Sequence, residues 1–127
     1  MNRNKTICIV DDQEVIVEMY RIKLEQAGYR VVVAEDGEQG YDVIRKIKPD
    51  LALIDIVMPK MDGLTLIRRI KKDKELYRIP VIILSNYIDP EENEEALKLG
   101  ALFSLSKPHF LPSQILEIID EVLKERE

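Results

Sequence analysis

The sequence predicts an α/β fold, a doubly wound sheet of five parallel strands with helices on both faces. Five short apolar runs alternate with five segments of helical period, so strands and helices follow one another in strict order. The strand segments are continuously apolar, which is typical of a parallel sheet that is buried on both faces. The 127 residues match one domain of ordinary size and leave no room for a second, so we expect a single domain over residues 1–127.

The first strand–helix pair begins with the apolar run Ile7–Val10, which ends at Asp11 and Asp12. The segment that follows has apolar residues at near-helical spacing, namely Val15, Ile16, Met19, Ile22 and Leu24. Gly28 is a typical helix stop, because glycine adopts the left-handed backbone that ends many helices.

The second and third strands are equally clear. Val31–Ala34 is a β-branched run that Asp36-Gly37 interrupts, and a helix through Tyr41 to Ile47 should follow and end before Pro49. The third apolar run, Leu51–Ile54, ends at Asp55.

The remaining elements carry strong boundary signals. Asp62 can cap the third helix. The fourth run, Pro80–Leu84, ends at Ser85, and Asp89-Pro90 then starts a helix that should stop at Gly100. The fifth run is Leu102–Leu105, with Lys107-Pro108 after it, and a last amphipathic helix covers residues 115–123.

Composition excludes several classes of protein. A net charge of −5 argues against non-specific nucleic-acid binding, which needs a basic face. The one cysteine, Cys8, excludes an internal disulfide. The N-terminal apolar run is too short for a signal peptide or a membrane span, so we expect a cytoplasmic protein with no membrane partner.

Polar residues follow four of the five predicted strands directly or nearly so, and the carboxyl ends of parallel strands meet at one edge. They are Asp11, Asp12, Asp55, Ser85 and Lys107. Each alone would be a turn former, a helix cap or a surface charge. Together, the carboxylates suit a hard cation such as Mg²⁺, and the lysine and hydroxyl suit an anion. This combination is typical of phosphoryl transfer, and Asp55, on the central strand, is best placed to become an aspartyl-phosphate.

These residues, with Met58-Pro59, Asp62-Gly63, Gly100-Ala101 and Lys107-Pro108, resemble the receiver domain of two-component response regulators over essentially the whole chain. The resemblance implies a flavodoxin-like fold with strand order 2-1-3-4-5. It also implies a phosphoacceptor switch, in which a sensor histidine kinase or a histidine phosphotransfer protein phosphorylates Asp55.

The resemblance further implies a role for each site residue. Asp12, Asp55 and the backbone carbonyl of Val57 bind Mg²⁺, while Asp11 acts more through water. Lys107 pairs with one phosphoryl oxygen, and the Ser85 hydroxyl moves to bond another. The Lys107–Pro108 bond is expected to be cis.

Several positions depart from the family pattern. Ser104 stands where an aromatic residue is usual, and Asn86 where alanine is usual. Val57 and Tyr87 occupy the two variable positions beside the site and favour a long-lived phosphoryl group. The acidic group at residues 91–95 is expected to stay solvated at a helix start.

Two further departures from the family pattern bear on the oligomeric state. Leu102 and Phe103 occupy positions where DNA-binding regulators that dimerise often carry paired acids, and the last helix has no basic residue before Lys124. That mode of dimerisation is disfavoured. We expect a monomer that could dimerise on phosphorylation.

Four candidate functions differ in how well the residues fit them. The first is a stand-alone switch that is not an enzyme beyond its own phosphorylation and dephosphorylation, with an output partner that the sequence does not name. The second is a receiver module of a longer transcription factor or enzyme. The third, a Mg²⁺-dependent phosphatase of the haloacid dehalogenase kind, is disfavoured because Val57 stands where that family has a second acid. A flavin-binding protein is disfavoured as well, because no Gly/Ser/Thr-rich phosphate loop follows the first strand.

Overall fold

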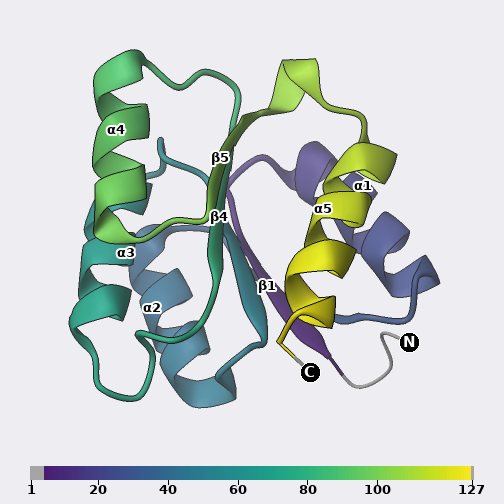
Figure 1. Cartoon of the computed structure of the whole chain (residues 1–127), viewed down its shortest axis with the longest axis horizontal. Coiled ribbons are helices and arrows are strands. Elements are labelled where there is room, and N and C mark those ends of the chain that lie inside the picture. The colour runs from purple at the N-terminus through teal and green to yellow at the C-terminus, as the bar shows by residue number, and fades with distance from the viewer. Residues whose placement is uncertain (1–4, 127) are drawn as a thin grey trace.

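Five parallel strands and five α-helices alternate along the chain in the computed structural model, which describes residues 5–126 (Figure 1). The strands pair in the order β2-β1-β3-β4-β5, so the predicted flavodoxin-like sheet is confirmed. The elements are β1 Thr6–Val10, α1 Glu14–Gln26, β2 Arg30–Ala34, α2 Gly37–Ile47, β3 Leu51–Ile54, α3 Gly63–Lys72, β4 Val81–Ser85, α4 Pro90–Leu99, β5 Phe103–Ser106, the 3₁₀ turn η1 Lys107–His109 and α5 Pro112–Lys124.

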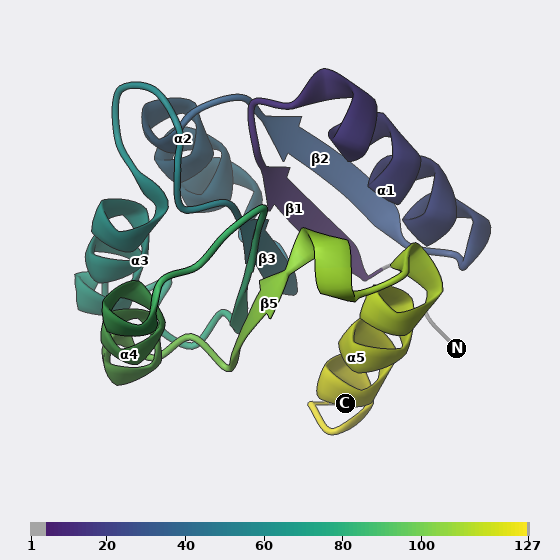
Figure 2. The same cartoon turned by 90° about the horizontal axis from the view of Figure 1, so that it is seen from above.

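Helices cover the sheet on both faces, with α1 and α5 on one side and α2, α3 and α4 on the other (Figure 2). Successive residues of a strand point to opposite faces, so Ile7 and Ile9 pack with α1 and α5, while Cys8 and Val10 pack with the other three helices. Both faces are therefore buried, which explains why the central strands are apolar at every position.

Aspartates start three of the helices, of which the caps Asp62 and Asp89 were predicted and the cap Asp36 was not. Asp36, Asp62 and Asp89 each accept a hydrogen bond at 2.8 Å from the backbone N–H three residues later. Gly28 and Gly100 have φ of 100° and 114°, so the predicted helix stops use the backbone region that favours glycine. Within residues 5–126 no helix is long and apolar enough to cross a membrane.

Helix α1 forms where predicted, but of the apolar set that predicted it only Leu24 is among its buried residues. Val17, Tyr20 and Leu24 pack against the sheet, whereas Val15 is 84% exposed and Met19 is 43% exposed. Apolar residues occur on both sides of this helix, so their spacing indicates a helix without deciding which side faces the core.

The bond between Lys107 and Pro108 is trans, so the expected cis bond is wrong. The chain turns here through the short 3₁₀ turn η1, in which the Phe110 N–H donates to the Lys107 carbonyl at 3.4 Å. This turn reverses the chain after β5 and presents Lys107 toward the sheet edge without a cis bond.

Candidate functional site

The carboxyl edge of the sheet fixes the two buried acids through backbone hydrogen bonds. The Asp11 N–H donates to the Ala34 carbonyl, and the Asp55 N–H donates to the Val10 carbonyl, both at 3.0 Å. Each bond continues the parallel ladder by one residue beyond its strand. The two side chains therefore project from ordered backbone rather than from free loops.

Three carboxylates meet at this edge, as predicted. Oxygens of Asp11, Asp12 and Asp55 all lie within 4.8 Å of one another. Asp11 and Asp55 are buried, whereas Asp12 is exposed. A set of closely spaced oxygen ligands with one open side fits a hard divalent cation that keeps part of its water shell, as Mg²⁺ does.

Lys107 brings a buried ammonium to the same edge. Its Nζ lies 2.6 Å from Asp11 Oδ2 and 3.8 Å from Asp55 Oδ2, and the lysine side chain is only 5% exposed. The charge is thus shared unequally between two acids, and the nearer acid is Asp11. A buried cation between carboxylates offsets part of their mutual repulsion.

Ser85 ends β4 and contacts Asp55 directly. Its hydroxyl donates to Asp55 Oδ1 at 2.6 Å, and both residues are buried. Burial raises the pKa of Asp55 above its usual value, and the negative charge of Asp11 adds to the rise. The hydrogen bond from Ser85 and the charge of Lys107 act in the opposite direction.

Gly63 shapes the loop after β3. A Cβ at this position would lie 2.1 Å from the carbonyl oxygen of Asp55, so no side chain fits. The Gly63 N–H donates to the Ile56 carbonyl at 2.8 Å, and Asp62 caps α3 one residue earlier. The Asp62-Gly63 pair therefore brings the start of α3 against the backbone of Asp55.

Gln13 is a site residue that sequence reasoning missed. Its Oε1 accepts hydrogen bonds from Lys107 Nζ at 2.9 Å and from Asn86 Nδ2 at 3.2 Å. The carboxamide thus bridges the Lys107 turn and the β4–α4 loop across the sheet edge. Its position directly after Asp11-Asp12 could have indicated a site residue. A glutamine at this position is equally typical of the start of a helix, here α1.

An open hollow of about 400 Å³ lies over these groups. Val57 and Tyr87 line it, each 71% exposed, which places both predicted flanking positions at its rim. Asn86 and Glu92 line it as well. Glu92 is half-buried in this wall, so it is less exposed to solvent than Glu91.

Comparison with known proteins agrees with this geometry. The family model described as "Response regulator receiver domain" matches residues 7–120. The chain belongs to this family. Receiver domains are signalling switches that typically bind Mg²⁺, and membership implies a histidine kinase or phosphotransfer protein as partner.

Relatives of two lengths match the receiver chain. It is 41% identical over 121 residues to the response regulator GtcR of Aneurinibacillus migulanus, covering 95% of this chain and 48% of that protein. It is 32% identical over 119 residues to the polar-differentiation response regulator DivK of Brucella anthropi, covering 94% of this chain and 96% of DivK. The chain spans about half the length of several curated relatives that it matches.

Solved structures share the fold of this receiver chain. The receiver domain of the Francisella response regulator 1452 superposes with a TM-score of 0.88 at 30% identity, covering 98% of this chain and 100% of that one. A CheY-like receiver domain protein from Methanospirillum hungatei has the same TM-score at 33% identity, with 95% and 94% coverage.

Proposed function

We propose that this receiver chain is a phosphoacceptor switch, in which a phosphoryl group passes from a phosphohistidine donor to Asp55 in the presence of Mg²⁺. The observation that carries the proposal is the placing of the Asp55 carboxylate between a hydroxyl, an ammonium and two further acids at one sheet edge. Residues 1–127 form the single receiver unit in this proposal.

The acidic side of the site would hold the metal. Asp12, Asp55 and the backbone carbonyl of Val57 are the proposed ligands, and Asp11 acts through water. When bound, Mg²⁺ neutralises charge on the phosphoryl oxygens and on the cluster of carboxylates. The oxygen-only donor set and the exposed side chain of Asp12 support this assignment.

The reaction uses the other side of the site. A carboxylate oxygen of Asp55 attacks the phosphorus, the bond from phosphorus to the donor imidazole breaks, and the imidazole keeps the electron pair and takes up a proton. Lys107 stabilises the negative charge of one phosphoryl oxygen. Ser85 exchanges its hydrogen bond with Asp55 for one with another phosphoryl oxygen.

A donor protein has a suitable surface beside the site. Val15, Met19 and Ile22 form an exposed apolar stripe along α1, starting four residues after Asp11, and Leu111 lies close to it before α5. Exposed apolar residues at this spacing fit the side of another helix. We propose that the histidine kinase or phosphotransfer protein docks here, because a donor on α1 reaches Asp55 without crossing the molecule.

Two alternative functions use the same carboxyl edge of the sheet. A receiver module within a longer regulator uses the same chemistry, and the coverage of GtcR supports it. A Mg²⁺-dependent phosphatase is disfavoured, because Val57 is apolar and offers no carboxyl for a general acid two residues after the nucleophile. A cytoplasmic location and a resting monomer complete the proposal.

Intact mass after incubation with a small phosphodonor and Mg²⁺ tests the proposal. The parent should gain one phosphoryl group, Asp55→Asn should gain none, and Asp42→Asn on α2 should behave as the parent. A phosphoryl group on Asp55→Asn, or none on the parent with any donor, would show that Asp55 is not the acceptor.

A further inference from the structure

Two arginines stack on one tyrosine where helices α2 and α3 lie side by side. The guanidinium carbons of Arg69 and Arg45 lie 4.3 Å and 5.7 Å from the centroid of the Tyr41 ring. The Tyr41 hydroxyl donates to Asp73 Oδ2 at 3.1 Å, which ties the ring of α2 to the end of α3. A guanidinium that lies over an aromatic ring keeps its N–H edge free, so each arginine can still donate two hydrogen bonds to a carboxylate.

Four exposed cations form a basic face around this stack. They lie in the last turns of α2 and α3 and are Arg45, Lys46, Arg69 and Lys72. Among residues 5–126, none of the four makes an ion pair. The negative ends of the two helix dipoles favour cations at these positions, which offsets part of their mutual repulsion. The charge of the basic face is therefore available to a partner.

Neighbouring acids do not neutralise the basic face. Glu75 pairs with Lys48 at 3.2 Å. The carboxylate of Asp73 accepts hydrogen bonds from the Tyr41 hydroxyl and from the backbone N–H of Glu75. Asp42 is exposed beside the end of α2. The four cations outnumber Asp42 and Asp73, so the face keeps a net positive charge with acids at its margin.

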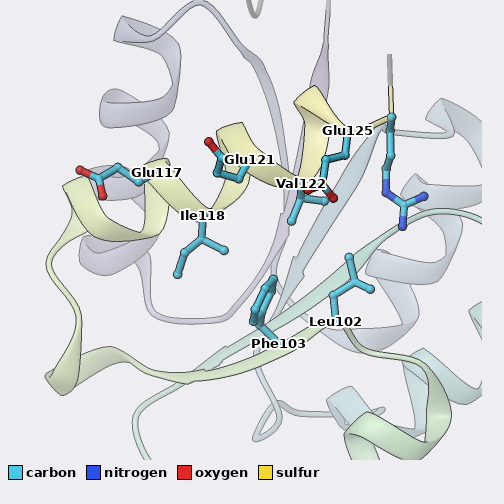
Figure 3. Close-up of a pocket in the computed structure, with 8 residues that line it drawn as sticks. Leu102, Phe103, Glu117, Ile118, Glu121, Val122 and Glu125 are labelled. Carbon is cyan, nitrogen blue, oxygen red and sulfur yellow. The ribbon is translucent and has the colours of Figure 1, made fainter.

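The opposite side of the molecule carries acids instead. Figure 3 shows Glu117, Glu121 and Glu125 along α5, beside a groove of about 700 Å³. Helix α5 covers the other face of the sheet from α2 and α3 (Figure 2). On a chain of net charge −5, the basic face is thus a local exception. A surface whose charge opposes that of the whole chain is suited to an acidic partner.

From these features we propose that the basic face binds an acidic segment of a partner protein, whose carboxylates are held by Arg45 and Arg69. A hollow of about 340 Å³ beside Arg45 and Lys46 gives one acidic side chain room to enter. The stack on Tyr41 orients the guanidiniums before the partner arrives, which lowers the entropy cost of binding. The surface goes beyond the phosphoacceptor proposal and does not depend on phosphorylation.

Two other occupants fit the basic face less well. A nucleic acid presents a continuous row of phosphates, which Asp42 and Asp73 would repel. A second copy of the chain would place its acidic α5 on α2 and α3. Because these helices lie on opposite faces of the sheet, that contact would continue into an open chain of molecules rather than close into a dimer.

Three synthetic probes test the proposal on the full chain. The first is a peptide of alanine and glutamine with glutamates at i, i+3 and i+7, the second has lysines in place of the glutamates, and the third is a single-stranded DNA. Fluorescence anisotropy measures binding, and amide NMR shifts locate it. We expect the acidic peptide to bind best and to bind more weakly as salt rises, with the largest shifts at residues 41–48 and 69–73.

Variants of the tyrosine test the stack itself. Tyr41→Phe keeps the ring and loses only the hydroxyl, so it should bind the acidic peptide as the parent does. Tyr41→Leu removes the ring under both guanidiniums and should weaken binding about fivefold. Equal binding by Tyr41→Leu and the parent would show that the stack does not prepare the site.

Charge variants separate the basic face from general attraction. Arg45→Gln and Arg69→Gln should each weaken binding about tenfold, as the loss of hydrogen bonds between charged groups would. Lys124→Gln makes the same change of charge on α5 and should leave binding unchanged. The amide spectrum of each variant checks its fold.

Four further outcomes would overturn the proposal. The first is equal binding of the acidic and basic peptides, and the second is amide shifts centred outside α2 and α3. Tighter binding of the DNA than of the acidic peptide would make a nucleic acid the occupant. Assembly of the chain in sedimentation that Arg45→Gln abolishes would make a second copy the occupant. Loss of phosphorylation in Asp55→Asn affects none of these measurements, so the two proposals fail independently.

Discussion

Lys107 Nζ lies 1.2 Å closer to the carboxylate of Asp11 than to that of Asp55, at 2.6 Å against 3.8 Å. The proposed phosphate-binding lysine is thus paired with an acid on the metal side of the site. A phosphoryl group on Asp55 would carry about two negative charges in place of the single charge of the carboxylate, and it would bring three acceptor oxygens within reach of the ammonium. Phosphorylation should therefore move Lys107 from Asp11 to the new group.

Magnesium should stabilise the fold through the acidic cluster. At a hundredfold excess over Kd, a ligand of the folded state adds about 2.7 kcal/mol to the free energy of unfolding. Asp12→Ala should lose this gain, and its metal-free melting temperature should rise because one of three close negative charges is gone. Thermal unfolding with and without Mg²⁺ measures both effects, with Asp42→Ala as the control. An unchanged Mg²⁺ response in Asp12→Ala would exclude the assigned site.

The raised pKa of Asp55 predicts how stability depends on pH without metal. Folding favours the protonated form of this carboxyl, so its contribution falls as pH rises from the ordinary value toward the folded pKa. Asp55→Asn does not titrate. The variant should therefore be more stable than the parent at neutral pH, and the advantage should shrink as pH falls to about 4. Urea unfolding across this range checks the sign, and an advantage that grows on acidification would contradict it.

The bridge from Gln13 to Asn86 should slow loss of the phosphoryl group. Both side chains line the hollow over Asp55, and they are hydrogen-bonded to each other. Gln13→Ala and Asn86→Ala should each speed hydrolysis about fivefold, as the loss of a hydrogen bond of about 1 kcal/mol would.

The double variant decides whether the two residues act as one bridge. Its hydrolysis should be no faster than that of the faster single variant, since either change alone opens the bridge. The rate is followed as loss of phosphoryl mass, with Gln26→Ala on α1 as the control. Strictly multiplicative effects would mean that the two side chains act separately.

Ser104 should be replaceable with a gain in stability. Its Oγ is buried without a hydrogen-bond partner in the described part of the chain, and a buried unpaired hydroxyl costs about 1–3 kcal/mol. Ser104→Ala should raise the free energy of unfolding by about 1 kcal/mol in urea. Ser106→Ala is the control, because the Ser106 hydroxyl has a hydrogen-bond partner, the Asn86 carbonyl at 3.5 Å. This variant should therefore not gain stability. A clear loss of stability in Ser104→Ala would show that its hydroxyl is bonded.

A phosphate mimic at Asp55 should move the β4–α4 loop more than β5. Ser85 and Lys107 contact Asp55, and the loop follows Ser85 directly in the chain, so a movement of Ser85 should displace the loop. The small side chain of Ser104 in β5 has no bulky group that would move with it. Amide signals from residues 86–95 should therefore shift more than those from 103–105. Equal shifts in the two regions would mean that Ser104 has not altered the switch.

Residue pattern predicted the sheet and most of the site for a common reason. Buried strands leave unbroken apolar runs, and the polar residue that ends each run marks the shared edge, as Asp11, Asp55 and Ser85 do. Gln13 was not predicted, because its role as a hydrogen-bond acceptor for Lys107 depends on its side-chain rotamer, which the sequence does not show. The exposed side of α1 escaped because apolar spacing alone does not choose between two apolar faces.

Sheet order has a consequence for how the site is assembled during folding. β1 lies inside the sheet and is flanked by β2 and β3, so the acids of β1 and β3 can come together while the C-terminal third is still being synthesised. The lysine that offsets their charge arrives only with β5 and η1, which add at the far edge. A chain stopped before β5 would hold three crowded carboxylates without Lys107. Formation of β5 therefore reduces the repulsion between the carboxylates at the end of β1, because it brings Lys107 to Asp11. This contact joins residues 96 positions apart and favours the complete sheet over partly formed ones.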